Sequence, residues 1–224
     1  MYKFIFKRII DITLSILSIL ILIPLLIPVV IGLMLTGEHH VFYFQERIGY
    51  KNKKFNIFKF VTMLKNSPNM GNGLHTTLKD PRILPMGFFL RKTKINELPQ
   101  LFNVFLGSMS IIGPRPLVDK TFEPYSNIVK MNIYNVKPGL SGIGSIIFRD
   151  EEKLLSDTKM PIDLFYKNLI SPYKGELELW YQNNLSFYTD SIIVFLTIWV
   201  ILFPNSDLVF KIFKDLPKKP DFLK

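Results

Sequence analysis

The feature of this sequence that most limits its fold is an uncharged apolar run at residues 12–35, ITLSILSILILIPLLIPVVIGLML. At about 1.5 Å per residue, a helix of this length would cross the roughly 30 Å hydrocarbon core of a bilayer. The run is too long for the apolar part of a secretory signal, and no small-residue cleavage site follows it. A helix that spans the membrane is therefore the first expectation.

Two prolines and the flanking charges favour another path. Pro24 lies in the middle of the run and Pro28 one turn later, and each removes a backbone donor and clashes with the preceding turn. Basic residues lie on both sides of the run, although positive charge stays on the cytoplasmic side of a membrane. A helix–break–helix that enters and leaves by one leaflet satisfies both flanks. We therefore expect a re-entrant membrane helix over residues 1–36, with its break at Pro24.

The charge balance predicts an anionic partner. The chain has a formal net charge of +10, and residues 37–94 hold eleven Lys or Arg against three acids. Nucleic acid, anionic lipid headgroups and phosphorylated substrates all fit a basic protein. We expect no nucleic acid, because no helix-turn-helix, RNP or zinc pattern accompanies the apolar anchor. The absence of cysteine excludes disulfides and thiolate metal sites.

The rest of the sequence predicts a mostly helical α+β domain. Residues 41–48 and 55–63 are rich in aromatic and branched side chains, and the turn-like GYKNKK between them predicts a β-hairpin. We expect a helix over 97–106, with Asn96 as its N-cap and Gly107 just beyond its end. Further helices are expected at about 83–92, 161–170, 172–184, 188–203 and 206–215, with breaks at Pro172 and Pro204.

A second apolar run, residues 191–203, is too short to span a bilayer. Two interpretations stay open: a core helix, or a helix in the membrane interface with Phe195 and Trp199 at headgroup level. The organisation that follows is a membrane helix, a compact domain over 37–215 and a flexible tail at 216–224.

Residues 91–116, RKTKINELPQLFNVFLGSMSIIGPRP, carry the most specific pattern in the chain. This run resembles the bacterial sugar transferases, the monotopic phosphoglycosyl transferases that act on polyprenyl phosphate. Other pieces match in the same order: FKRIID before the apolar run, QERIG in the predicted hairpin, DPRI before the core motif, and KPGLSG and WYQNNLSFYTD after it. The resemblance covers nearly the whole chain and is to the family's minimal form, without extra transmembrane helices.

The resemblance implies an enzyme that transfers a phosphosugar from a UDP-sugar to undecaprenyl phosphate, with Mg²⁺ as cofactor and UMP as product. It implies a re-entrant helical hairpin joined to a small catalytic domain, here residues 37–215, with interfacial amphipathic helices. The expected location is the cytoplasmic face of the bacterial inner membrane. Because the reaction is the first membrane step of glycan biosynthesis, membrane lipids and downstream glycosyltransferases are the further partners expected.

The family motif normally carries Asp-Glu where this chain has Asn96-Glu97, and the Asp is held to be the nucleophile. An amide is not an anionic nucleophile, so Asn96 is expected to cap the helix and orient the donor. Glu97 is then the carboxylate expected to matter: either it attacks phosphorus, or it binds Mg²⁺ for direct attack by the lipid phosphate. Arg91, Arg115 and Arg149 match family positions and are expected to bind phosphate, which a guanidinium contacts in a bidentate manner.

The replacement at Asn96 keeps a second function open. The chain would then be a non-catalytic relative that binds polyprenyl phosphate or partner enzymes as a membrane scaffold. The retention of Glu97 and of the three arginines favours catalysis, since a scaffold has no need of a phosphate site.

Overall fold

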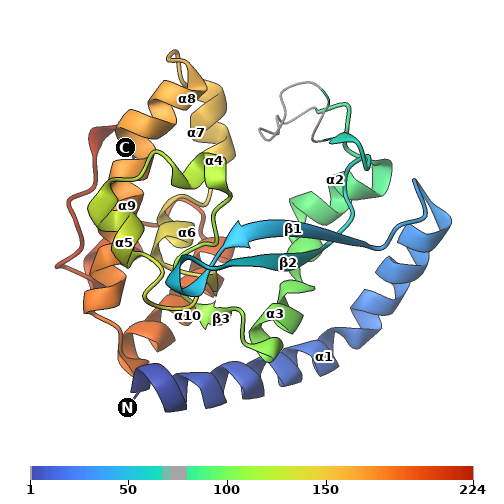
Figure 1. The fold of residues 1–224 in the computed structure, drawn as a ribbon, viewed down its shortest axis with the longest axis horizontal. Coiled ribbons are helices and arrows are strands. Elements are labelled where there is room, and N and C mark those ends of the chain that lie inside the picture. The colour runs from blue at the N-terminus through green and yellow to red at the C-terminus, as the bar shows by residue number, and fades with distance from the viewer. Residues whose placement is uncertain (1, 68–69, 71–79, 224) are drawn as a thin grey trace.

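The computed structural model describes residues 2–67, 70 and 80–223 (Figure 1). It is an α+β fold that is 58% helical, which confirms the predicted class. The α-helices are α1 (Lys7–Leu35), α2 (Pro85–Lys92), α3 (Gln100–Leu106), α4 (Asp119–Phe122), α5 (Asn127–Asn132), α6 (Ile143–Ile147), α7 (Glu151–Asp157), α8 (Ile162–Phe165), α9 (Ser171–Asn183), α10 (Phe187–Leu202) and α11 (Leu208–Ile212). The strands are β1 (Phe42–Ile48), β2 (Lys54–Phe60), β3 (Ser110–Ile112) and β4 (Gly139–Ser141). Short 3₁₀ or π segments are η1 (Tyr2–Phe6), η2 (Tyr50–Asn52), η4 (Ile95–Glu97), η5 (Tyr166–Ile170) and η6 (Asp221–Leu223).

The apolar run forms α1, one continuous helix that contains both Pro24 and Pro28. The helix is therefore not interrupted at Pro24, and the re-entrant break there stays a prediction. Each proline removes a single intrahelical hydrogen bond, and a long helix absorbs such a loss by bending. Figure 1 shows α1 curving around the lower and right-hand sides of the domain. Among the described residues, α1 is the one helix that is long and apolar enough to cross a membrane.

Polar contacts hold the first turns of α1 against the domain. Lys7 forms an ion pair with Asp190 of α10, and both side chains are buried. Asp11 accepts hydrogen bonds from the Ser110 hydroxyl (3.0 Å) and from a backbone N–H of β3 (2.9 Å). The Arg8 guanidinium donates to two carbonyl oxygens at the end of α3, both at 2.6 Å. These residues lie just before the uncharged run, so its N-terminal end is fixed to the domain.

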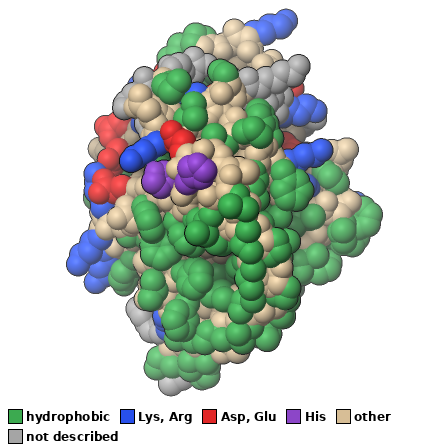
Figure 2. Space-filling model, turned by 90° about the vertical axis from the view of Figure 1, so that its right-hand side faces the viewer, with side chains coloured by type: hydrophobic (Ala, Val, Ile, Leu, Met, Phe, Trp, Pro, Cys, Tyr) green, Lys and Arg blue, Asp and Glu red, His purple; other side chains and the backbone are tan. Residues whose placement is uncertain are grey.

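Apolar contacts hold the other end of α1 against the same domain. Val29 and Leu33 are buried in a cluster with Phe60 of β2 and Leu90 of α2. Between its two ends, α1 leaves most of its apolar side chains exposed, with Ile21 at 67%. Figure 2, which views the molecule from the right-hand side of Figure 1, shows apolar side chains gathered over the lower part of that side, below the histidines and charged side chains. A helix that is apolar and unburied along most of its length suits a lipid environment better than water.

The predicted β-hairpin is confirmed. β1 and β2 pair antiparallel, with Phe42 opposite Phe60 and Phe44 opposite Phe58. The rings of these two pairs lie 5.6 Å and 5.3 Å apart, centroid to centroid, on one face of the hairpin. Because side chains alternate along a strand, the intervening residues share the opposite face. That face carries Tyr43, Gln45, Arg47 and Lys59.

The segment after α2 differs from the prediction. Asn96 does not cap a helix; it lies inside the 3₁₀ turn η4, and α3 begins three residues after Glu97, at Gln100. The first N–H groups of α3 find backbone carbonyls of the preceding turn instead, such as Leu101 N–H to Leu98 at 3.0 Å. Gly107 ends α3 in the left-handed conformation (φ 93°), as predicted.

The C-terminal half is helical, with the main core where α6, α9 and α10 meet. Ile143, Leu177 and Leu196 are fully buried there. Pro204 separates α10 from α11, as predicted, whereas the break predicted at Pro172 is wrong. The π-helical segment η5 joins α8 to α9, and Pro172 lies in the first turn of α9, where a missing N–H costs little.

The second apolar run forms α10, which has two different faces. Ile193, Leu196 and Val200 are buried in the core, whereas Phe195 and Ile198 are exposed. The core interpretation is therefore confirmed for one face of α10.

The last residues also contact this core. The ring of Phe222 lies 5.9 Å from that of Phe165 and 6.5 Å from that of Phe148. Part of the segment predicted to be a flexible tail, 216–224, is thus packed against the domain.

Candidate functional site

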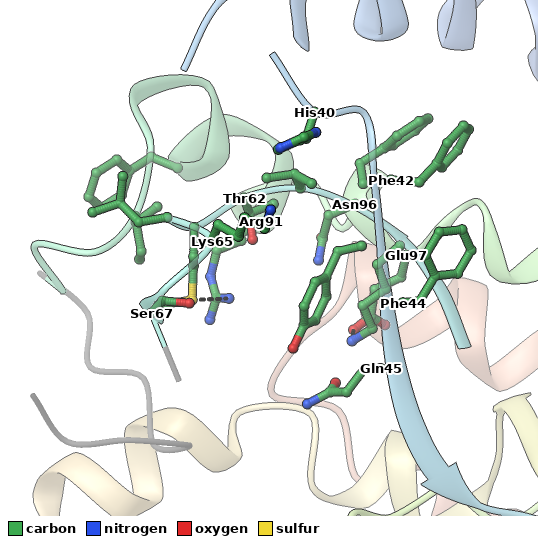
Figure 3. A pocket seen from close by; sticks show the side chains of 18 of the residues that line it. His40, Phe42, Phe44, Gln45, Thr62, Lys65, Ser67, Arg91, Asn96 and Glu97 are labelled. Atoms are coloured by element: carbon green, nitrogen blue, oxygen red, sulfur yellow. Dashed lines mark hydrogen bonds and ion pairs between the residues drawn. The ribbon is translucent and has the colours of Figure 1, made fainter. Parts of the chain in front are cut away.

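A pocket of about 1060 Å³ lies between the hairpin, α2 and the turn η4. Tyr43, Gln45 and Lys59 come from the open face of the hairpin, and Arg91 comes from α2. Figure 3 shows Asn96, Glu97 and Gln45 beside the same open space. The pocket adjoins the apolar helix α1, since Phe60 of β2 lines the pocket and also packs in the cluster that buries Val29 and Leu33 of α1.

The pocket is strongly cationic. Among the described residues that line it, seven are Lys or Arg and two are Glu. Seven minus two leaves a formal charge of +5. A concave cationic site concentrates anionic ligands and gains most from ligands with several charges, such as a diphosphate.

Glu97 lies at the centre of this charge. Its Oε1 accepts from the Lys59 ammonium at 3.1 Å and from the Arg115 guanidinium at 3.3 Å. Burial favours the neutral acid, but Arg115 and Lys59 outweigh it and hold the pKa of Glu97 well below its usual range. Glu97 is therefore an anion at any working pH and needs no base to deprotonate it. All these hydrogen bonds are to Oε1, which leaves Oε2 for a ligand.

The pKa of Lys59 is shifted so that its neutral form is favoured, whereas that of Glu97 favours the charged form. Burial lowers the pKa of Lys59 to about 8. The repulsion of Arg115 adds to this shift, and the attraction of Glu97 opposes it. Its proton is therefore lost more easily than that of an ordinary lysine. In the sequence, Lys59 is one of eleven basic residues in the segment 37–94 and is not marked as a site residue. The register of the hairpin was the signal for it, because Lys59 lies opposite Tyr43 on the face that carries Gln45 and Arg47.

Asn96 is 7% exposed, and its Oδ1 is a buried oxygen without a hydrogen-bond partner in the described part of the chain. A buried amide oxygen that stays unpaired costs free energy, on the order of 1–3 kcal/mol. Asn96 also lines the pocket, so a rotation of its amide would bring this oxygen to a ligand that donates a hydrogen bond or coordinates through oxygen. The structure thus gives Asn96 the place in the site that the sequence suggested, but without the capping role.

The three predicted arginines lie in different places. Arg115 and Arg91 both line the pocket, and Arg91 Nη1 lies 3.9 Å from the sulfur of Met63 (Figure 3). Arg149 is exposed just after α6 and does not line the pocket. The structure thus brings two of the three arginines together with Asn96 and Glu97.

For a hard cation such as Mg²⁺, the described residues that line this pocket offer oxygen donors. The described residues contain no group of three or more His, Cys, Asp or Glu side chains arranged to hold a metal ion. Mg²⁺, however, is commonly held by one or two protein oxygens together with substrate phosphates. The Glu97 carboxylate is a donor of that kind, with the Asn96 amide adjacent to it, and it fits a site completed by a phosphorylated ligand.

Comparison with known proteins agrees with the resemblance seen in the motifs. The sequence pattern of the bacterial sugar transferases matches residues 2–204. The chain is 33% identical over 174 residues to the exopolysaccharide production protein ExoY of Sinorhizobium fredii, and the match covers 71% of this chain and 76% of that protein. It is 33% identical over 169 residues to the UDP-glucose:undecaprenyl-phosphate glucose-1-phosphate transferase of Klebsiella pneumoniae, covering 72% of this chain and 36% of the relative.

A third relative uses a different sugar, according to its name. The chain is 34% identical over 148 residues to the UDP-N-acetylgalactosamine-undecaprenyl-phosphate N-acetylgalactosaminephosphotransferase of Aeromonas hydrophila, covering 65% of this chain and 34% of the relative. Several longer relatives are matched over only 27% to 36% of their length. The match to the family pattern nevertheless extends over most of this chain, which therefore belongs to the bacterial sugar transferase family.

Proposed function

We propose that the protein transfers a phosphosugar from a UDP-sugar to undecaprenyl phosphate and releases UMP, as the first membrane step of glycan biosynthesis. The observation that carries the proposal is an ionised carboxylate, Glu97, held by Lys59 and Arg115 in a cationic pocket next to the apolar helix α1. The names of the relatives supply the substrate classes, a UDP-sugar and undecaprenyl phosphate.

The charges in the pocket suit this chemistry. The transfer breaks the bond between the sugar-linked phosphorus and the oxygen of UMP, and forms a new bond from that phosphorus to an oxygen of the lipid phosphate. Donor and acceptor bring several negative charges together, and phosphoryl transfer depends mainly on positioning and neutralising them. Lys59, Arg91 and Arg115 provide fixed positive charge for both substrates.

Glu97 is the carboxylate on which we expect turnover to depend. In one route it attacks phosphorus and forms a covalent intermediate, and in the other it holds a metal ion while the lipid phosphate attacks directly. Both routes require an ionised oxygen that faces the pocket. Glu97 Oε2, with the Asn96 amide beside it, would hold Mg²⁺, which when bound would neutralise further charge on the diphosphate.

The contacts of α1 support a re-entrant topology. If α1 spanned a bilayer, its two ends would lie on opposite sides, about 30 Å of hydrocarbon apart. Both ends instead contact one domain: Asp11 and Ser110 at one end, Leu33 and Leu90 at the other. We infer that α1 enters and leaves by the cytoplasmic leaflet of the inner membrane, with the exposed face of α10 in the interface. Single cysteines introduced near each end of α1 should label from the same side; labelling from opposite sides would contradict this topology.

One observation favours a second function. Asn96 stands where the family carries the nucleophilic Asp, and a chain that lost this nucleophile would still bind the same ligands. Such a protein would act as a scaffold for polyprenyl phosphate or for downstream glycosyltransferases. Activity that appears only in Asn96→Asp would support the scaffold.

The test is UMP release by detergent-purified protein. UDP-glucose, UDP-galactose and UDP-N-acetylgalactosamine would each be supplied with Mg²⁺ and undecaprenyl phosphate. We expect wild-type turnover and its loss in Glu97→Gln and Arg115→Ala, while Lys54→Ala, which removes an exposed charge outside the pocket, retains it. Turnover that survives in Glu97→Gln would overturn the role of Glu97, and no release from any donor would turn us to the scaffold.

A further inference from the structure

The pocket contains an amide whose orientation is fixed. Gln45 Oε1 accepts a hydrogen bond from Arg47 Nη2 at 2.6 Å, and Arg47 Nη1 donates to the Pro116 carbonyl at 3.2 Å. A guanidinium has only donors, so the oxygen of the Gln45 amide must be the atom that faces it. The amide nitrogen therefore faces away from Arg47, and Figure 3 shows it directed into the open space of the pocket. No other hydrogen bond of the Gln45 side chain is found in the described part of the chain.

An aromatic side chain lies beside this amide. Tyr43 is two residues earlier on β1, so it lies on the same face of the hairpin. It is 41% exposed, lines the pocket and makes no ring contact with another described aromatic side chain. A planar ring next to a fixed hydrogen-bond donor is a combination that binds a flat heterocycle by stacking and by one edge.

This pair lies next to the cations that surround Glu97. Tyr43 lies directly opposite Lys59, whose ammonium contacts Glu97, and Gln45 is two residues further along β1. Two residues of a strand extend about 7 Å. The Tyr43 ring and the Gln45 amide thus lie beside two cations of the pocket, Lys59 and Arg47. A nucleotide whose phosphates contact these cations would bring its base within reach of the ring and the amide.

We propose that Tyr43 and Gln45 form the base site of the nucleotide donor and that Gln45 selects uracil over cytosine. This inference rests on the proposed function and identifies which part of the pocket reads the nucleotide. The O4 carbonyl of uracil accepts a hydrogen bond from the Gln45 N–H. Cytosine carries an amino donor at the same position, so two donors would oppose each other. A site built to pair one hydrogen-bonding group rejects an analogue that leaves it unpaired.

The test compares the binding of UMP and CMP to the detergent-purified full chain by calorimetry. Wild type should bind UMP about tenfold more tightly than CMP, which is the difference of one hydrogen bond of about 1.4 kcal/mol. Gln45→Leu removes the donor and should abolish most of this preference. Gln45→Glu keeps an acceptor for Arg47 but presents an oxygen to the pocket, so it should favour CMP. A reversed preference is a result that a purely structural role of Gln45 would not produce.

The outcomes also separate this inference from the proposed function. Equal weakening of UMP and CMP binding in Gln45→Leu would mean that the amide contacts phosphate or sugar, and would overturn the base site. Equal binding of both nucleotides by wild type would overturn it as well. Turnover of UDP-sugars together with either result would leave the proposed transferase intact. UMP preference without turnover would support the base site and count against catalysis.

Discussion

The buried ion pair between Lys7 and Asp190 offers the sharpest test of how α1 is held to the domain. Both side chains are 10% exposed, and the hydroxyl groups of Tyr2 and Tyr181 also donate to Asp190, at 2.6 and 2.7 Å. Asp190→Ala would leave the Lys7 ammonium without its buried counter-charge and would remove the carboxylate to which both hydroxyl groups donate; of the two, Tyr181 also has the Ile112 carbonyl as an acceptor, at 3.2 Å. Removing one partner of a buried pair costs about 3–5 kcal/mol. For a chain of this size, each kcal/mol lowers the unfolding temperature by about 2–4 °C.

The expected result is therefore a fall of roughly 10 °C in the unfolding temperature of Asp190→Ala. Thermal unfolding in detergent can be followed by tryptophan fluorescence, because Trp180 packs against Phe213 at 4.9 Å and reports on the core. Asp119→Ala is the matched control: Asp119 pairs with Lys54 at 2.9 Å, but their side chains are 68% and 52% exposed. Exposed pairs contribute about 0–1 kcal/mol, so this variant should unfold close to wild type. Similar shifts in the two variants would refute the reasoning.

Two further predictions concern pH. Because the pKa of Lys59 is lowered to about 8, the ammonium beside Glu97 is lost as pH rises through 8, and UMP affinity should fall. Lys59→Arg should keep its affinity for UMP above pH 8, since a guanidinium stays charged. Calorimetry on either side of pH 8 measures both. Burial, opposed by Lys174, raises the pKa of Glu178 to about 7, so the folded chain keeps a proton that the unfolded chain releases above 4.5. Stability should therefore fall as pH rises from about 4.5 to 7, and unfolding temperatures measured across that range should show a smaller fall in Glu178→Gln. A wild-type stability that does not change over this range would contradict the raised pKa of Glu178.

The local sequence pattern was sufficient to predict the hairpin, and the hairpin supplies several of the residues that line the pocket. Aromatic and branched residues on both sides of the turn-like GYKNKK predicted both strands, and the register of the pair places Gln45 and Lys59 on one face. The contact between Lys59 and Glu97 was not predictable in the same way. The two residues are 38 positions apart and lie on different elements, so only the packing of η4 against β2 brings them together.

Two expectations at the helices, an interruption at Pro24 and a cap at Asn96, are not met for the same physical reason. The rules for Pro24 and Asn96 treat each helix as isolated, with its backbone groups dependent on local partners. In the structure α1 continues through Pro24, since packing at both ends constrains it, and α3 takes its first acceptors from the turn before it. Tertiary contacts thus replaced the local partners that the sequence rules assume.

The electrostatics of Asn96 bear on the choice between the two candidate functions. An Asp at this position would place a second carboxylate beside Glu97, and the two anions would compete for Lys59 and Arg115. With Asn96, both cations act on Glu97 alone, and the pocket keeps one more positive charge for an anionic ligand. The amide thus favours donor binding while it removes one anionic oxygen from the chemistry. A transferase and a scaffold would therefore both bind the nucleotide, and turnover is the measurement that separates them.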